Sequence, residues 1–189
     1  MAIKCKNVLE VILFEYAKLI ADAAVEQRAR HEPAARAGSN YWSFVAMIFR
    51  KLVAGKISPS SVLRENQLVV AVGQECAYCG RTGALQWEHI IPRARGGPDT
   101  FDNMVLSCAS CNNQKSSKNP VDWYRQRGLN RKHVPRLVMG KLLKLVLDEH
   151  RRRGTLADVE FPPGQSLSTS QVCRVFEYPD GGTNAGTRG

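Results

Sequence analysis

Two Cys-x-x-Cys motifs constrain the fold of this chain more than any other feature of its sequence. Cys76 and Cys79 form the first motif, and Cys108 and Cys111 form the second. The two-residue gap lets both sulfurs of a pair reach one ion from a tight turn, so the four thiolates suit a single tetrahedral Zn²⁺. Zinc with four thiolate ligands has no open position, and we therefore predict a structural ion and not a catalytic one.

The separation between the motifs indicates that a folded insert lies between the two pairs. Residues 80–107 form a longer spacer than a plain zinc ribbon uses. A zinc ion would pin both ends of this insert and supply much of its folding free energy. Independent free thiols are the alternative, and a redox pair is disfavoured because two pairs are present. Cys5 and Cys173 stand alone and receive no role.

The first residues of the chain carry no export or membrane signal. Acids and lysines interrupt the apolar run in MAIKCKNVLEVILFEYAKL, and no uninterrupted apolar stretch approaches the ~20 residues that a membrane helix needs. We therefore expect a cytoplasmic protein that does not enter a membrane. Cysteines in that compartment usually stay reduced, which favours metal binding over disulfides.

The segments that flank the cysteine motifs carry helical periodicity. Apolar residues recur at helical spacing over residues 6–30 and 40–54, and a third helix is predicted over 58–68, with Ser58 as its N-cap. Residues 134–152 form a long basic amphipathic pattern, and the stretch KNPVDWYRQRGL before it is interpreted as a break. Together with short strand signals between the cysteine pairs, these patterns predict an α+β fold.

The same patterns divide the chain into four predicted parts. Residues 1–73 form a helical N-terminal segment and residues 74–118 the core around the cysteines. Residues 119–176 form a basic helical extension, and residues 177–189 form a flexible tail with little to bury.

The net charge of +10 is concentrated just after the second cysteine pair. Residues 111–153 carry twelve Lys or Arg residues against three acids. Such an asymmetry indicates a polyanionic partner, although a solvated helix surface would also explain it.

The stretch LQWEHIIPRARGGPDTFDN, inside the insert, sets the carboxylate of Glu88 beside the imidazole of His89. A Pro, a Gly-Gly pair, an Asp-Asn pair and a final Cys-Asn-x-x-Lys follow in that order. This arrangement between two Cys-x-x-Cys pairs resembles the HNH endonuclease motif, over about residues 74–118. The resemblance implies a zinc-stapled ββα-metal nuclease unit, here with a helical segment before it and a basic helix after it.

The resemblance also implies a role for each residue that matches the motif. His89 matches the general base that activates the attacking water, and Glu88 matches the neighbouring acidic metal ligand. Asn103 matches the residue that ties down the following loop and helps to hold the catalytic histidine. Asn112 matches the second protein ligand of the catalytic cation. Many relatives have Asp in place of Glu88 and His in place of Asn112, and both variants occur within the family.

Elementary chemistry agrees with these roles. An imidazole titrates near neutral pH and is a suitable base for activating water. A divalent cation would offset the negative charge that develops on the phosphate and on the leaving oxygen. Glu88 and Asn112 offer hard oxygen ligands, which suit Mg²⁺ or Mn²⁺. Successive side chains of a strand point to opposite faces, so Glu88 and His89 share a site only if the strand ends or twists there. Pro92 and the Gly96-Gly97 loop fit such an end. The alternative is that His89 is a packed core residue and Glu88 a surface charge.

Basic residues around the motif are the candidate nucleic-acid contacts. They are Arg93, Arg95, Lys115, Lys118, Arg125 and Arg127. Contacts of this kind set affinity without choosing a sequence. Trp123 and Tyr124 are candidates for stacking on bases, but core packing is the favoured interpretation.

The resemblance therefore implies an HNH-type endonuclease that hydrolyses DNA, with double-stranded DNA as the expected substrate and 5′-phosphate and 3′-hydroxyl products. A zinc-dependent DNA- or RNA-binding module without turnover is one alternative, and a nuclease acting on RNA or single strands is another. One active site cuts one strand, so cutting both would need a homodimer or sequential nicks.

Overall fold

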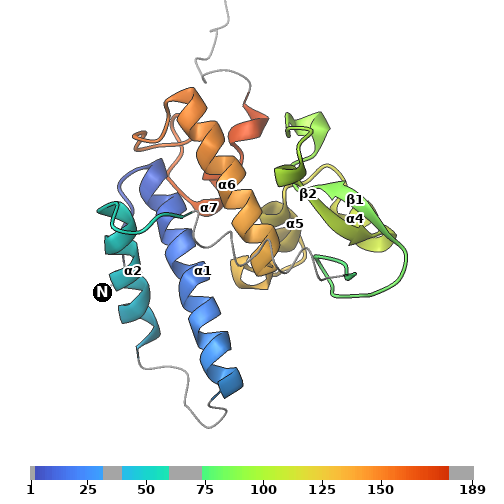
Figure 1. The fold of residues 1–189 in the computed structure, drawn as a ribbon. Coiled ribbons are helices and arrows are strands. Elements are labelled where there is room, and N and C mark those ends of the chain that lie inside the picture. Colours follow the sequence, from blue (N-terminus) through green and yellow to red (C-terminus); the bar gives the residue numbers. More distant parts are fainter. Residues whose placement is uncertain (1–2, 32–39, 60–73, 179–189) are drawn as a thin grey trace, which may run out of the picture.

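The computed structural model describes residues 3–31, 40–59 and 74–178 of the chain (Figure 1). The predicted third helix lies mostly outside the described residues, and so does the predicted tail beyond residue 178. The prediction of an α+β fold is confirmed, because the described residues form several helices and one small two-stranded sheet. No helix among the described residues has the length and apolar character to cross a membrane.

Two N-terminal helices lie side by side and contribute much of the buried core (Figure 1). Helix α1 spans Val8–His31 and helix α2 spans Tyr41–Val53, close to the predicted ranges. Phe14 and Phe49 pack edge to face between them, with ring centroids 5.6 Å apart. Apolar residues three and four positions apart fill the contact, as the helical periodicity predicted.

A hairpin and a short helix follow in the region of the cysteines. Strand β1 (Leu85–His89) pairs antiparallel with strand β2 (Met104–Cys108), and the register sets Leu85 opposite Cys108 and His89 opposite Met104. Helix α4 (Ala109–Lys115) leaves directly from the end of β2. Between the strands the chain forms two 3₁₀ turns, η1 (Arg93–Arg95) and η2 (Phe101–Asn103).

The interpretation of KNPVDWYRQRGL as a break is wrong, because this stretch forms helix α5 (Pro120–Gln126). The Asn119 side chain accepts a hydrogen bond from the Asp122 backbone N–H at 3.0 Å and so caps the helix. Pro120 occupies the first turn, where its missing N–H costs nothing. The Asn-Pro pair therefore starts a helix here.

The C-terminal elements connect the region of the cysteines to the N-terminal helices. Short turn η3 (Arg131–His133) precedes helix α6 (Arg136–Arg153), and helix α7 (Thr169–Val172) and turn η4 (Val175–Glu177) follow. Helix α6 runs through the middle of the molecule, in contact with α1 and with η2 and η4 (Figure 1).

Buried polar contacts join these elements. The carboxylate of Asp122 in α5 accepts hydrogen bonds from Ser170 at 2.7 Å and from Arg174 at 3.0 Å. Helices α5 and α7 and the chain just after α7 are thereby fixed to one another.

His150, near the end of α6, is a fully buried neutral histidine. Its Nε2 lies 3.0 Å from the Val172 carbonyl and its Nδ1 lies 2.7 Å from the Thr155 hydroxyl. Burial lowers the pKa of His150 below its ordinary value of 6.5, although the Val172 carbonyl acts in the opposite direction.

We expect the free energy of unfolding to fall as the pH drops below about 6.5. His150 then binds a proton in the unfolded chain but stays unprotonated in the folded protein, where its pKa is lower. One such proton contributes a slope of about 1.4 kcal/mol per pH unit. The measurement is the free energy of unfolding in urea at about pH 5.5 and about pH 7.5. The variant His150→Gln should lose this slope and His133→Gln should keep it. Equal slopes in the wild type and in His150→Gln would contradict the assignment.

Candidate metal centre and nuclease site

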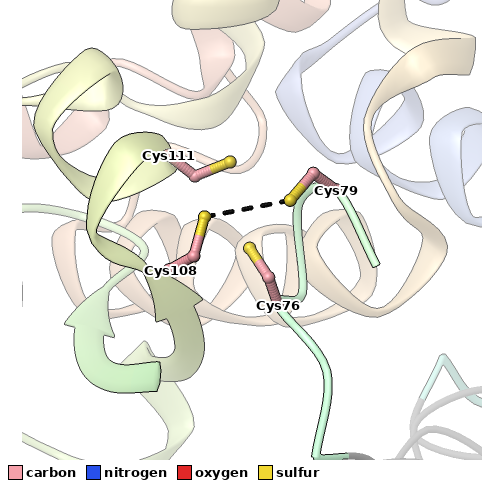
Figure 2. A group of neighbouring side chains, drawn as sticks. All are labelled: Cys76, Cys79, Cys108 and Cys111. Atoms are coloured by element: carbon pink, nitrogen blue, oxygen red, sulfur yellow. Dashed lines mark hydrogen bonds between the residues drawn. The ribbon is translucent and has the colours of Figure 1, made fainter. Parts of the chain in front are cut away.

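The four motif cysteines converge on one point (Figure 2). Their sulfur atoms all lie within 4.8 Å of one another, and Cys79 Sγ lies 3.8 Å from Cys108 Sγ. A tetrahedron of sulfurs about 2.3 Å from a central zinc ion has edges of about 3.8 Å, so the donor set fits Zn²⁺. Four clustered cysteines in this region were predicted from the spacing of the motifs, and this part of the prediction is confirmed.

Local backbone geometry aims each pair of sulfurs. In the first pair the Gly80 N–H donates to the Cys76 carbonyl at 2.8 Å, and Gly80 has a φ of 70°, which favours glycine. In the second pair Cys108 ends β2 and Cys111 lies in the first turn of α4.

Backbone donors favour the thiolate form of one cysteine in the cluster. Burial alone would raise the pKa of Cys76, but backbone N–H groups of Cys108, Tyr78 and Cys79 outweigh it and lower that pKa to about 6. Burial and the neighbouring sulfurs raise the pKa of Cys111. Because zinc binds thiolates, uptake of the ion would release protons from the remaining thiols.

Strand β1 presents His89 and Glu88 to opposite sides. Trp87 and His89 share one face of the strand, and Glu88 is buried on the other. Glu88 accepts a hydrogen bond from the Tyr78 hydroxyl at 2.6 Å, and it forms an ion pair with Lys115. The Lys115 ammonium also donates a hydrogen bond to the His89 carbonyl, at 2.9 Å.

The environment of Lys115 differs from the one we expected. The side chain is fully buried, so it does not face a phosphate, and it is instead the internal partner of Glu88. Burial lowers the pKa of Lys115, and the carboxylate of Glu88 opposes that shift. We expected Lys115 to contact a phosphate from the surface of α4. The sequence does not show which side of α4 the hairpin covers, and Lys115 lies on that covered side.

Asn103 fixes the loop that follows His89. Its side chain accepts from the Ile91 N–H at 2.8 Å and donates to the carbonyls of Ile91 and Pro98 at 2.9 and 2.8 Å. The loop also passes so close to itself that a Cβ at Gly97 would lie 1.9 Å from the Ile91 carbonyl oxygen. The position of the chain just beyond His89 is therefore closely determined.

The side chain of Asp99 supplies a partner for His89 that the sequence reasoning missed. His89 Nε2 lies 2.9 Å from Asp99 Oδ1, and Arg93 Nη1 lies 3.7 Å from Asp99 Oδ2. The hydrogen bond with His89, assisted by the charge of Arg93, lowers the pKa of Asp99 below its ordinary value. The one sequence signal was an acid in the glycine-rich loop, and such an acid is also an ordinary turn residue.

A surface hollow of about 210 Å³ brings the predicted residues together. It is lined by Trp87, Glu88, His89, Pro92, Arg93, Asn112 and Ser116. Three of the four predicted catalytic residues thus border one space, and Asn103 supports the loop behind it. Trp87 and Ser116 also line the hollow and were not among the predicted residues.

The predicted nucleic-acid contacts have unequal surroundings. Arg93 lines the hollow and its side chain is 68% exposed. Arg95 lies 3.2 Å from Glu177, Arg125 lies 3.0 Å from Asp122, and Lys118 is partly buried. The guanidinium of Arg127 lies over the Trp123 ring, 5.2 Å from its centroid.

Trp123 and Tyr124 do not stack on bases in this arrangement. Both are buried, and Trp123 packs edge to face against Tyr78 with centroids 5.2 Å apart. They are core residues, the interpretation that the sequence favoured.

Comparison with known proteins points to the same chemistry. Residues 76–118 match the HNH endonuclease family. The chain is similar to the CRISPR-associated endonuclease Cas9 of Corynebacterium diphtheriae, with 32% identity over 111 residues. That similarity covers 55% of this chain and 10% of the relative. No solved structure matches the chain significantly.

The family match begins at Cys76 and ends a few residues after Cys111, and the residues that line the hollow beside His89 all lie within it. The similar protein from Corynebacterium diphtheriae is itself named an endonuclease. From Cys76 to Lys118 this chain is therefore an HNH endonuclease domain.

Proposed function

We propose that the HNH domain hydrolyses phosphodiester bonds of DNA with His89 as the general base. The observation that carries the proposal is the hydrogen bond between His89 Nε2 and Asp99, at the edge of a hollow that Asn112 also lines. An ionised carboxylate only accepts hydrogen bonds, so the shared proton belongs to Nε2. The lone pair of Nδ1 is then free to take a proton from the attacking water.

The remaining site residues support a divalent cation. Glu88 and Asn112 would hold Mg²⁺ or Mn²⁺, and a carboxylate has about four lone-pair positions, of which Tyr78 and Lys115 use two. When bound, the cation would offset the charge on the scissile phosphate and the leaving 3′-oxygen. We expect products with 5′-phosphate and 3′-hydroxyl ends, as the resemblance to HNH endonucleases implies. The cysteine cluster would hold a structural Zn²⁺.

The other parts of the chain have supporting roles in this proposal. The helices before residue 74 are a scaffold, residues 74–118 are the nuclease core, and residues 119–176 are a basic extension that adds contacts to the DNA backbone. We propose a cytoplasmic protein that acts on double-stranded DNA by nicking one strand per site. A homodimer would allow both strands to be cut.

A plasmid assay tests the proposed function directly. The full chain with Mg²⁺ should convert supercoiled plasmid to the nicked form, and EDTA should stop the reaction. A structured RNA of similar length serves as the comparison substrate. Binding of the plasmid without any nicking in Mg²⁺ or Mn²⁺ would favour the binding module, and faster cleavage of RNA would overturn the choice of DNA.

Replacement of Asp99 tests how His89 is held. Asp99→Ala should lower kcat by about 10- to 100-fold with little change in KM, since the imidazole loses the partner that fixes its orientation and tautomer. Asp99→Asn keeps an acceptor oxygen and should lose less activity. Asp148→Ala, an exposed acid on α6, is the matched control. The role is refuted if Asp99→Ala and Asp148→Ala cleave DNA equally fast.

A further inference from the structure

Two large aromatic side chains next to the hollow are open to solvent. Trp87 is 51% exposed and Phe101 is 61% exposed. Their rings meet edge to face, with centroids 5.3 Å apart and planes 60° apart. Trp87 comes from β1 and Phe101 from η2, so residues of two elements make one aromatic surface, which we call the Trp87–Phe101 pair.

Contacts from α6 hold the outer ring of this pair in place. Lys141 Nζ donates to the carbonyls of Phe101 at 3.1 Å and Met104 at 2.7 Å. The same ammonium lies 4.9 Å from the centroid of the Phe101 ring, and Lys144 forms an ion pair with Asp102. The exposed ring of Phe101 is therefore held in position by the buried ammonium of Lys141.

The position of Trp87 relates the pair to the catalytic histidine. Trp87 lines the same hollow as His89, Arg93 and Asn112. Two residues along one face of a strand are about 7 Å apart, roughly the distance between neighbouring phosphates of a nucleic-acid strand. A phosphate at His89 would thus place the neighbouring nucleotide of the strand near Trp87.

Exposed cations lie near both members of the pair. Arg93 lines the hollow together with Trp87, is 68% exposed and lies 3.7 Å from Asp99. The partly exposed Lys144 forms an ion pair with Asp102, next to Phe101 in the chain. Aromatic faces flanked by cations are the surfaces on which unpaired bases stack. In an intact duplex the faces of the bases are covered by their neighbours, so only a base that has left the stack can use such a surface.

We propose that the Trp87–Phe101 pair stacks on an unpaired base next to the scissile phosphate, so the domain prefers DNA that is single-stranded or locally unpaired there. This inference rests on the proposed function for the place of the scissile phosphate. It replaces duplex DNA in general, as the expected substrate, with duplexes that are opened at the cleavage position and with single strands.

Tryptophan fluorescence tests the contact without requiring cleavage. The full chain carrying His89→Ala is titrated with a single-stranded DNA oligonucleotide, the fully paired duplex, and the duplex with one mismatched pair. The single strand and the mismatched duplex should quench the fluorescence more strongly than the paired duplex. Adding Trp42→Phe, which removes a tryptophan that is 60% exposed on α2, should leave the quenching in place, and adding Trp87→Phe should remove it.

Affinity provides the second measurement. Trp87→Ala and Phe101→Ala should each weaken binding of the single strand by at least about 5-fold and change binding of the paired duplex much less. Equal effects on both substrates, or no effect, would overturn the proposal. A change in oligomeric state in sedimentation of Trp87→Ala would show that the pair is a protein interface, and would overturn it as well.

The two proposals fail separately. A chain that cleaves DNA normally when Trp87 and Phe101 are replaced refutes stacking and leaves the nuclease intact. A wild-type chain that shows the fluorescence response but never cuts refutes the nuclease and leaves stacking intact.

Discussion

His89→Ala should reduce DNA cleavage by about 10²- to 10⁴-fold, the usual contribution of a positioned general base. The loss should fall on kcat, because the imidazole acts on the attacking water and not on the binding of the DNA backbone. His89 lies at the end of β1 with its side chain partly exposed, so its removal leaves the hairpin contacts and the support from Asn103 in place. The fold and the affinity for DNA should therefore be unchanged.

The measurement compares initial nicking rates in Mg²⁺ with binding to the same DNA. His133→Ala is the matched control, since His133 lies in η3 among its own capping contacts with Asn130. A His89→Ala protein that nicks plasmid at the wild-type rate would rule out His89 as the base. A variant that loses binding together with cleavage would show that His89 holds the substrate.

Removal of the structural ion should have the second large effect, and it should act on folding. Structural zinc sites contribute on the order of 10–16 kcal/mol in small domains, which is as large as the whole stability of a typical domain. The hairpin of β1 and β2 has only two strands, too few to be stable without support. Cys79→Ser or Cys108→Ser should therefore unfold the HNH domain and abolish cleavage.

The zinc content of the purified protein, with its near-ultraviolet circular dichroism, checks this result. Wild type should carry one zinc ion per chain, and the signal of Trp87 should be lost from Cys108→Ser. Cys5→Ser is the control, because Cys5 lies outside the cluster. Helices α1, α2 and α6 should keep most of the far-ultraviolet signal. An intact domain without zinc would contradict the prediction.

Local patterns were sufficient to predict the three long helices α1, α2 and α6 and the cysteine cluster. The apolar spacing that places Val45, Ile48 and Leu52 on one side of α2 is visible in the sequence, because helical period and burial coincide there. Helix α5 was missed because Pro120 was interpreted as a helix breaker, although Asn119 before it is a residue type that caps helices.

The surroundings of the site residues could not be predicted in the same way. The contact between Lys115 and Glu88 joins residues 27 positions apart, and the contact between His89 and Asp99 spans ten. Each depends on how α4 and the glycine-rich loop fold against the hairpin, which no local period encodes. Strand alternation alone would turn Glu88 and His89 to opposite faces, and we expected the end of the strand to bring them into one site. In the structure Glu88 is buried against Tyr78 and Lys115, whereas His89 meets Asp99.

Contacts with residues beyond the family match hold the HNH domain and the helix that follows it in place. Lys141 contacts η2, Glu177 pairs with Arg95, and Arg174 pairs with Asp122. A gene fragment trimmed to the stretch that the family match covers would leave out every one of these contacts. Trp123 packs against Tyr78, so the excised piece would also lose an aromatic neighbour from its interior. Anyone transplanting the catalytic unit into a fusion protein should carry the chain through to Tyr178.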